Sequence, residues 1–276
     1  LDINSNGWEL VSPDFGDQEY PMGMFISGNH ILFSTSNYLW ISNDNGISWT
    51  SKYIEYNGSD NFVQIGNRIY KDGGNTGILY CDNFDSNWQE LPLINNFSIH
   101  SLAPAGGKLL CGNPYKGVYR LDESTNQLIP ANEGLTSAVV TYLDASDIHL
   151  WAACGNGVFA YDLASKTWVD KAVLPDSDVQ YYEQVSVSKS GEVAAFGWLT
   201  NRFYLSTDSG VSWDTIYPFD NGGFGDWDYV EKVNWLDDVL LVKGEFSDKR
   251  STDFGQSWTE VSAPLDIVPF NGKHFG

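Results

Sequence analysis

The chain has 276 residues, of which 15% are aromatic, 18% are charged and 27 are glycine, a profile typical of a turn-rich all-β domain and not of a disordered or coiled-coil one. Its formal net charge is −21, from 36 acidic and 15 basic residues, and such a surface repels the phosphates of nucleic acids and anionic lipids. We therefore expect no nucleic-acid partner. Because no apolar run approaches membrane-spanning length, we also expect no membrane insertion.

The first predicted strand covers residues 7–11 and has no neighbouring strands of its own. The next four predicted strands are short, rich in aromatic or β-branched residues, and bounded by Gly, Asn, Asp or Ser. They cover residues 24–27, 30–35, 38–42 and 49–53. We interpret them as strands A, B, C and D of one repeating unit.

Tryptophan residues give the period of this unit. The spacings between six of them are 41, 39, 80, 45 and 45 residues, and they join Trp8, Trp49, Trp88, Trp168, Trp213 and Trp258. The spacing of 80 residues corresponds to two periods, and Leu128 stands near the position where a tryptophan is missing. A period of about 40–50 residues is that of a four-stranded propeller blade.

An eight-residue phrase, Ser-x-Asp-x-Gly-x-Ser-Trp, occurs at residues 42–49, 206–213 and 251–258. Its Asp can accept hydrogen bonds from the backbone of a tight turn, its Gly can adopt positive φ, and its Trp opens the next strand. The phrase resembles the Asp-box of sialidase-like β-propellers, which joins strands C and D of a blade. That resemblance implies a structural and not a catalytic role for Asp44, Asp208 and Asp253.

A second resemblance lies in the middle of the chain. Residues 134–140, 147–153 and 157–159 are similar to the repeat of two-component-regulator sensor propellers, with its Gly-Leu start and its Leu-Trp strand. Nearly the whole chain resembles non-catalytic Asp-box propellers, including the group related to photosystem II assembly factors and their secreted bacterial relatives. Both resemblances imply a fold far more than an activity.

The number of blades follows from the strands left at the two ends. Six complete sets fit between Met22 and Pro264, and residues 267–270 and 273–275 are predicted as strands A and B of a further blade. We therefore expect an all-β, seven-bladed β-propeller of four-stranded antiparallel blades, formed by residues 1–276 as a single domain. The N- and C-terminal strands would join in one sheet and close the ring. A six-bladed propeller is the alternative.

In this topology the B–C and D–A loops share one face, where loops on a rigid scaffold commonly carry function. Three segments near blades five and six combine aromatic and charged residues: 175–183, 197–202 and 217–229. The predicted ligand-binding residues are Tyr181, Tyr182, Trp198, Arg202, Asp226, Trp227 and Asp228. They suit a sugar, with a ring on its apolar face and acids at its hydroxyls, but they could equally cap turns and pack in the core.

Sialidase activity is not expected, because the chain has four arginines and lacks the Arg-Ile-Pro sequence before its first Asp-box. Asp178 and Asp226 are the candidates for the paired carboxylates of another glycoside hydrolase or of a lyase. The histidines lack metal-ligand spacing. Asp-x-Asp pairs such as 176/178 and 226/228 could hold Ca²⁺ but lack the full loop signature, so no metal or cofactor is expected. Cys81, Cys111 and Cys154 are expected to be small buried thiols.

Together these features predict a monomeric, non-catalytic binding propeller that recognises a glycan or a protein partner. The acidic, aromatic-rich composition favours an extracellular, periplasmic or cell-surface location. Two alternatives stay open: a glycoside hydrolase or lyase that uses paired carboxylates, and a ligand-sensing domain of a larger receptor.

Overall fold

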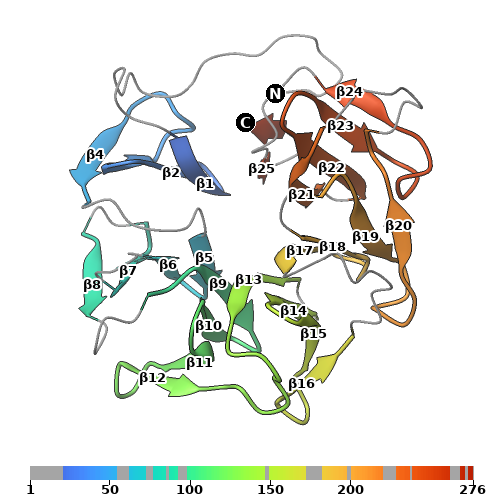
Figure 1. Ribbon diagram of the computed structural model, residues 1–276. Coiled ribbons are helices and arrows are strands. Elements are labelled where there is room, and N and C mark those ends of the chain that lie inside the picture. Colours follow the sequence, from blue (N-terminus) through green and yellow to red (C-terminus); the bar gives the residue numbers. More distant parts are fainter. Residues whose placement is uncertain are drawn as a thin grey trace. The chain divides into compact units, whose positions relative to one another are not determined.

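The computed structural model describes residues 21–54, 62–72, 77–84, 87–92, 98–146, 149–171, 182–197, 200–219, 228–236, 238–261, 268–270 and 273–275 (Figure 1). Every regular element among these residues is a β-strand, and together they form six four-stranded sheets and one two-stranded sheet. The described residues include no helix long and apolar enough to span a membrane. The chain divides into two compact units, residues 1–102 with 266–276 and residues 103–265.

Unit 1 contains two of the four-stranded sheets, blades 1 and 2. Blade 1 consists of β1 (Pro21–Ser27), β2 (His30–Thr35), β3 (Tyr38–Ser42) and β4 (Thr50–Tyr53). Blade 2 consists of β5 (Phe62–Ile65), β6 (Arg68–Asp72), β7 (Gly77–Asp82) and β8 (Gln89–Pro92). Consecutive strands pair antiparallel in both blades, so the predicted order A-B-C-D is confirmed.

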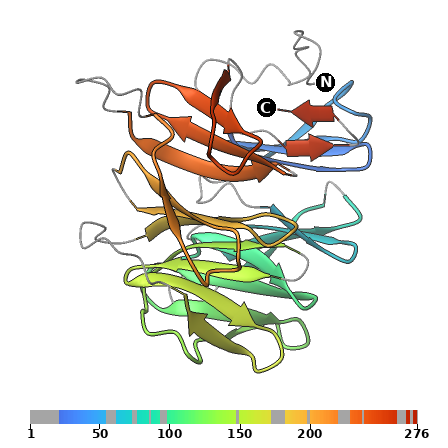
Figure 2. The ribbon, with the colours of Figure 1, turned by 90° about the vertical axis from the view of Figure 1, so that its right-hand side faces the viewer.

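Unit 2, whose boundary falls within β9, holds the other four blades (Figure 2). Blade 3 consists of β9 (Ser101–Ala105), β10 (Lys108–Asn113), β11 (Gly117–Asp122) and β12 (Gln127–Pro130). Blade 4 consists of β13 (Val140–Ala145), β14 (Leu150–Cys154), β15 (Gly157–Asp162) and β16 (Thr167–Asp170). Blade 5 consists of β17 (Tyr182–Val187), β18 (Val193–Gly197), β19 (Phe203–Ser206) and β20 (Asp214–Ile216). Blade 6 consists of β21 (Val230–Leu236), β22 (Val239–Gly244), β23 (Asp248–Ser251) and β24 (Thr259–Val261).

The prediction of seven blades is wrong, because the described strands form a propeller fold with six four-stranded blades. The last two strands, β25 (Val268–Phe270) and β26 (Lys273–Phe275), pair only with each other among the described strands, and β25 lies against β1. A seventh blade would need strands C and D beside them, and none is present among the described residues. Residues 7–11, which were predicted to supply one of these strands, lie outside the described residues.

Blade 4 shows why the strands are almost continuously apolar. Successive residues of a strand face opposite sides of its sheet. Leu150, Ala152 and Cys154 of β14 belong to a core shared with blade 3, whereas Trp151 and Ala153 belong to a core shared with blade 5. Because both faces of the sheet are covered, every residue of β14 is buried and the strand has no polar side.

The predicted character of the cysteines is confirmed. Cys81, Cys111 and Cys154 are buried and have free thiols. Burial raises the pKa of the Cys154 thiol to about 12, because the interior disfavours a thiolate. These thiols therefore act as small apolar groups in the core.

The three repeated phrases form the same turn between strands C and D, and we call them the Asp-turns (residues 42–49, 206–213 and 251–258). In the first, the Asp44 carboxylate accepts hydrogen bonds from Ser42 Oγ at 2.8 Å, Ser48 N at 2.9 Å and Ser48 Oγ at 2.6 Å. The Gly46 N–H donates to Ser42 Oγ at 2.8 Å, and Gly46 has the predicted positive φ, 85°. The other two Asp-turns repeat these contacts, so all three carboxylates are engaged in holding their own turns.

Tryptophans at the start of strand D connect neighbouring blades of unit 2. The Trp168 Nε1–H of blade 4 donates to the carbonyl of Ala131, directly after blade 3, at 2.8 Å. The Trp213 Nε1–H of blade 5 likewise donates to the carbonyl of Lys171, directly after blade 4, at 2.9 Å. The regular tryptophan spacing therefore reflects one contact that recurs at each of these two blade boundaries.

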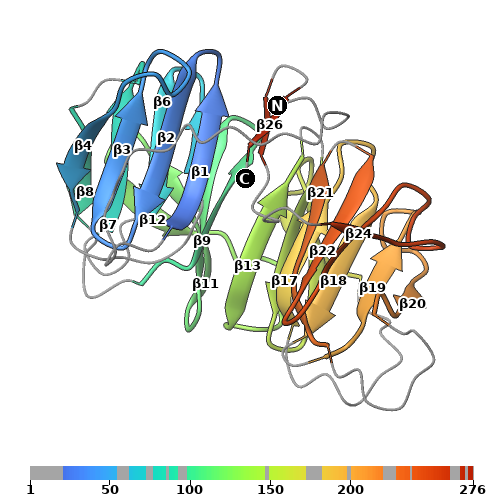
Figure 3. The same ribbon diagram turned by 90° about the horizontal axis from the view of Figure 1, so that it is seen from above.

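The inner strands of blades 4, 5 and 6 are linked by polar side chains, and Figure 3 shows β13, β17 and β21 side by side. The Asp144 carboxylate on β13 accepts a hydrogen bond from the backbone N–H of Val187 on β17 at 2.8 Å. On β17, Gln184 Oε1 accepts from Val233 N of β21 at 3.2 Å, and its Nε2 donates to Asn234 Oδ1 at 3.3 Å. Burial raises the pKa of Asp144 to about 6, although backbone N–H groups oppose that change.

The raised pKa of Asp144 predicts a dependence of stability on pH. Because its folded pKa lies above the ordinary value of 3.8, the folded state binds the proton more tightly, and the resulting stabilisation is lost as the pH rises through about 6. We expect the free energy of unfolding, measured by urea denaturation, to decrease by on the order of 2 kcal/mol as the pH rises from 3.8 to about 6. Asp144→Asn should reduce the slope, and Asp214→Asn, at an exposed position on β20, should leave it unchanged. An unchanged slope in Asp144→Asn would contradict the assignment. Asp208 and Asp253 change the stability only at lower pH, because hydrogen bonds from Ser side chains and backbone N–H groups lower their pKa values to about 2.

Candidate functional site

The B–C and D–A loops of unit 2 lie at the ends of the blades where the inner strands begin. We call this surface the B–C face and define it by its described residues 114–116, 131–139, 155–156, 200–202, 217–219, 228–229 and 245–247. Backbone hydrogen bonds join neighbouring loops: Gly117 N donates to Ala138 O at 2.8 Å, Gly155 N to Val139 O at 3.0 Å, and Val230 N to Thr200 O at 2.8 Å. The loops therefore form a fixed surface along the blades.

The B–C loop of blade 6 is held by a buried carboxylate. Asp228 Oδ1 accepts the backbone N–H of Phe246 at 3.0 Å, and Asp228 Oδ2 accepts the Ser247 hydroxyl at 2.8 Å. The Gly244 N–H donates to Ser247 O at 2.9 Å, and Glu245 N donates to Tyr229 O at 3.2 Å. Four hydrogen bonds therefore fix this short loop against the end of the preceding D–A loop.

This fixed loop presents an aromatic ring to solvent. Phe246, at its tip, is 77% exposed. Tyr115, in the B–C loop of blade 3, is also 77% exposed, and Asn113 Oδ1 accepts its backbone N–H at 2.8 Å. Tyr217 is a further exposed aromatic residue on this face. On the opposite loops Phe254 is exposed as well, but its ring packs against Trp235 with centroids 6.2 Å apart.

Charged side chains lie on the strands next to the loop of Phe246. Lys243 Nζ lies 3.2 Å from Glu231 Oε2, and Lys249 Nζ lies 5.6 Å from the centre of the Phe219 ring. The pKa of Asp248 is raised, chiefly by burial and further by the negative charges of Asp228 and Glu231. The strands near Phe246 therefore carry both positive and negative charges, and the Asp248 carboxyl lies near two other carboxylates.

Three of the predicted ligand-binding residues lie among the described residues. Tyr182 is 6% exposed in the core between blades 4 and 5, with its ring against Tyr204. Asp228 is 6% exposed and holds the loop of blade 6, as described above. Arg202 is partly buried directly before β19, and Thr200 Oγ1 lies 2.9 Å from its carbonyl oxygen. These contacts are structural, and whether the three residues also bind a ligand stays a prediction.

The structure brings two of the predicted segments close together, since the N–H of Val230, directly after segment 217–229, donates to the carbonyl of Thr200 in segment 197–202. The other predicted residues, Asp178, Tyr181, Trp198, Asp226 and Trp227, lie outside the described residues. The hydrolase or lyase alternative depends on Asp178 and Asp226 and stays a prediction. Sequence analysis missed Phe246 and Tyr115, each of which stands in a short loop between two strands of its blade.

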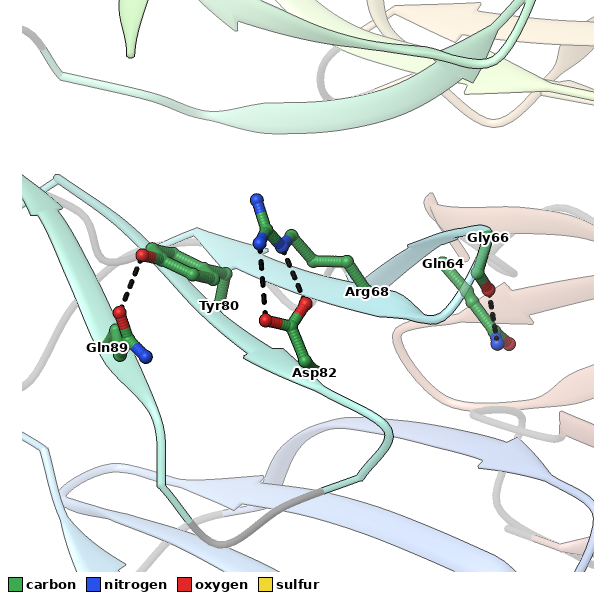
Figure 4. A network of polar contacts seen from close by, with 6 residues as sticks. All are labelled: Gln64, Gly66, Arg68, Tyr80, Asp82 and Gln89. Atoms are coloured by element: carbon green, nitrogen blue, oxygen red, sulfur yellow. Dashed lines mark hydrogen bonds and ion pairs between the residues drawn. The ribbon is translucent and has the colours of Figure 1, made fainter. Parts of the chain in front are cut away.

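A separate polar network lies in blade 2 of unit 1 (Figure 4). Arg68 Nε donates to Asp82 Oδ1 at 2.8 Å and Arg68 Nη2 donates to Asp82 Oδ2 at 3.2 Å, while the guanidinium carbon lies 4.6 Å from the centre of the Tyr80 ring. The Tyr80 hydroxyl donates to Gln89 Oε1 at 2.7 Å, and Gln64 Nε2 donates to Gly66 O at 3.0 Å. This ion pair lowers the pKa of Asp82 and raises that of Arg68, so both charges are satisfied within the blade.

Comparison with known proteins supports this architecture. The chain is similar to YCF48 bound to a D1 peptide, at 16% identity over 82% of this chain and 76% of that one, with a TM-score of 0.62. It is similar to the extracellular domain of BT4673 from B. thetaiotaomicron, at 13% identity over 91% of this chain, with a TM-score of 0.68. YCF48 from Cyanidioschyzon merolae matches at 12% identity over 89% of this chain and 85% of that one, with a TM-score of 0.63.

The chain has a β-propeller fold. At such low identities the similarity concerns the fold alone, and the chain spans 34% of the compared extracellular domain of BT4673. The predicted resemblance to assembly-factor and regulator propellers is confirmed at that level, whereas membership of the Asp-box group stays a prediction. No protein-family model matches the chain, and no curated protein matches it.

Proposed function

We propose that this propeller is a non-catalytic binding module that recognises an extended peptide segment of a protein partner on its B–C face. The observation that carries the proposal is Phe246, a large apolar ring that is 77% exposed on a loop fixed by a buried carboxylate. Aromatic side chains are enriched among residues that dominate protein-binding energies. A ring carried on a backbone that is already fixed loses less conformational entropy on binding than one on a flexible loop.

The fold neighbours favour a protein ligand over a glycan. One is YCF48 bound to a D1 peptide, and another is an extracellular domain. A binding propeller with a net charge of −21 also suits an extracellular, periplasmic or cell-surface location, where we place this protein. The rings of Tyr115 and Tyr217 on the same face supply further contact area for an extended segment.

Selection of random peptides displayed on phage, with the purified chain as the target, tests the proposal. We expect short peptides to be enriched, and Phe246→Ala to weaken the affinity of the selected peptides by about tenfold or more in calorimetric titration. Because Phe246 is exposed, its truncation should leave the stability nearly unchanged.

Val211→Ala is the matched control, because Val211 is also highly exposed but lies in the Asp-turn of blade 5, on the opposite loops. This variant should bind the selected peptides as tightly as the unchanged chain. Peptides that bind Phe246→Ala equally well would place recognition elsewhere. Enrichment of no peptide, together with binding on a glycan array, would replace the proposal with glycan recognition.

A further inference from the structure

The inner strands of blades 4, 5 and 6 share an irregularity near the B–C face. Each pairs with its neighbour through a register shift after its first residue, between Val140 and Tyr142, between Tyr182 and Gln184, and between Val230 and Lys232. The extra residues in these bulges are Thr141, Glu183 and Glu231. A bulge leaves its extra residue out of the regular ladder and redirects its side chain.

Two of these three side chains have partners within the protein. Thr141 Oγ1 lies 2.6 Å from the carbonyl oxygen of Tyr182 and 3.0 Å from that of Ala153. Glu231 forms its ion pair with Lys243 at 3.2 Å. The carboxylate of Glu183 has no hydrogen-bond or ion-pair partner among the described residues.

The surroundings of Glu183 favour a cationic partner. Its side chain is exposed to solvent, yet the protein around it raises the pKa of its carboxyl through desolvation. A carboxylate that has lost part of its hydration gains more from a counter-ion than a fully hydrated one does. Glu183 therefore presents a solvent-exposed carboxylate, without an ion-pair partner among the described residues, to an incoming cation.

We propose that Glu183 pairs with a lysine or arginine side chain of the peptide segment that binds the B–C face. The inference rests on the proposed function and specifies the chemistry of the partner. Position supports it, since Glu183 directly follows Tyr182 at the start of β17, and β17 lies beside β21, which begins next to the loops of blades 5 and 6. Charge supports it as well, because a net charge of −21 attracts a cationic segment and raises its rate of association.

The peptides selected on the unchanged chain provide the test. We expect them to share a lysine or arginine, and Glu183→Gln to weaken their binding by about fivefold to fiftyfold. In a double-mutant cycle, replacing the peptide cation with a neutral residue should weaken binding to the unchanged chain and have little effect on binding to Glu183→Gln. Asp214→Asn removes the same charge from the outer strand of the same blade and should have no comparable effect.

The outcomes separate this inference from the proposed function. Peptides that depend on Phe246 but carry no shared cation, or that bind Glu183→Gln as tightly as the unchanged chain, would overturn the pairing and leave the binding module intact. If Asp214→Asn lost as much affinity as Glu183→Gln, the effect would be due to net charge, and the pairing would also be overturned. Failure to select any peptide would remove the proposed function and the pairing together.

Discussion

Replacement of Trp168 by alanine is expected to lower the free energy of unfolding by about 3–5 kcal/mol. The Trp168 side chain is 3% exposed and packs in the core shared by blades 3 and 4, with its ring centroid 4.9 Å from that of Tyr161. Its loss would leave a cavity and also remove the hydrogen bond to Ala131 O. Urea denaturation followed by tryptophan fluorescence and circular dichroism would measure the change.

Trp168→Phe separates packing from hydrogen bonding. It keeps most of the apolar ring but loses the donor to Ala131, so we expect a smaller loss of about 1–2 kcal/mol. The backbone of Trp168 is also closely packed. A Cβ atom on Gly134, which has a φ of 84°, would lie 2.2 Å from Trp168 O. A loss below about 1 kcal/mol in Trp168→Ala would show that this indole does not join the blades.

Replacement of Asp228 by alanine is expected to destabilise blade 6 by about 2–3 kcal/mol and to abolish binding at Phe246. The carboxylate accepts the Phe246 N–H and the Ser247 hydroxyl, and its removal leaves a partly buried amide without its acceptor. The B–C loop of blade 6 would then lose its fixed position. Urea denaturation would measure stability, and titration with the selected peptides would measure binding.

Asp238→Ala provides the control, because this exposed residue lies in the A–B loop of the same blade and the substitution changes the net charge equally. It should change neither stability nor peptide affinity. If Asp228→Ala lost stability but still bound the selected peptides with full affinity, the fixed position of Phe246 would be irrelevant to recognition.

The repeat and its strands could be predicted because local chemistry determines them. In blade 1 the strands predicted at 30–35 and 38–42 have the bounds of β2 and β3, and the strand predicted at 273–275 has those of β26. The Asp-turns fix the C–D connection through contacts within eight residues, and the tryptophans follow at a regular spacing. Signals of this range are visible in a single sequence.

The number of blades depended on pairing between distant segments, and the prediction of seven failed there. Residues 267–270 and 273–275 have the composition of strands A and B, but composition does not say whether two further strands join them. The candidate site was harder for a related reason. Tyr182 and Asp228 were chosen for their chemistry, yet packing places both in the interior, whereas Phe246 is exposed because its neighbours hold the loop outward.

The recurrent bulges of the inner strands have a consequence for how such a protein changes over evolutionary time. Positions 141, 183 and 231 carry Thr, Glu and Glu at equivalent points of successive blades, outside the ladder that holds each sheet together. Thr141 hydrogen-bonds to Tyr182 O of the next blade, but mutations at positions 183 and 231 alter polarity, size or charge at one spot while the ladder of each sheet remains intact. Partner preference can therefore diversify at these places one amino acid at a time, without a new scaffold.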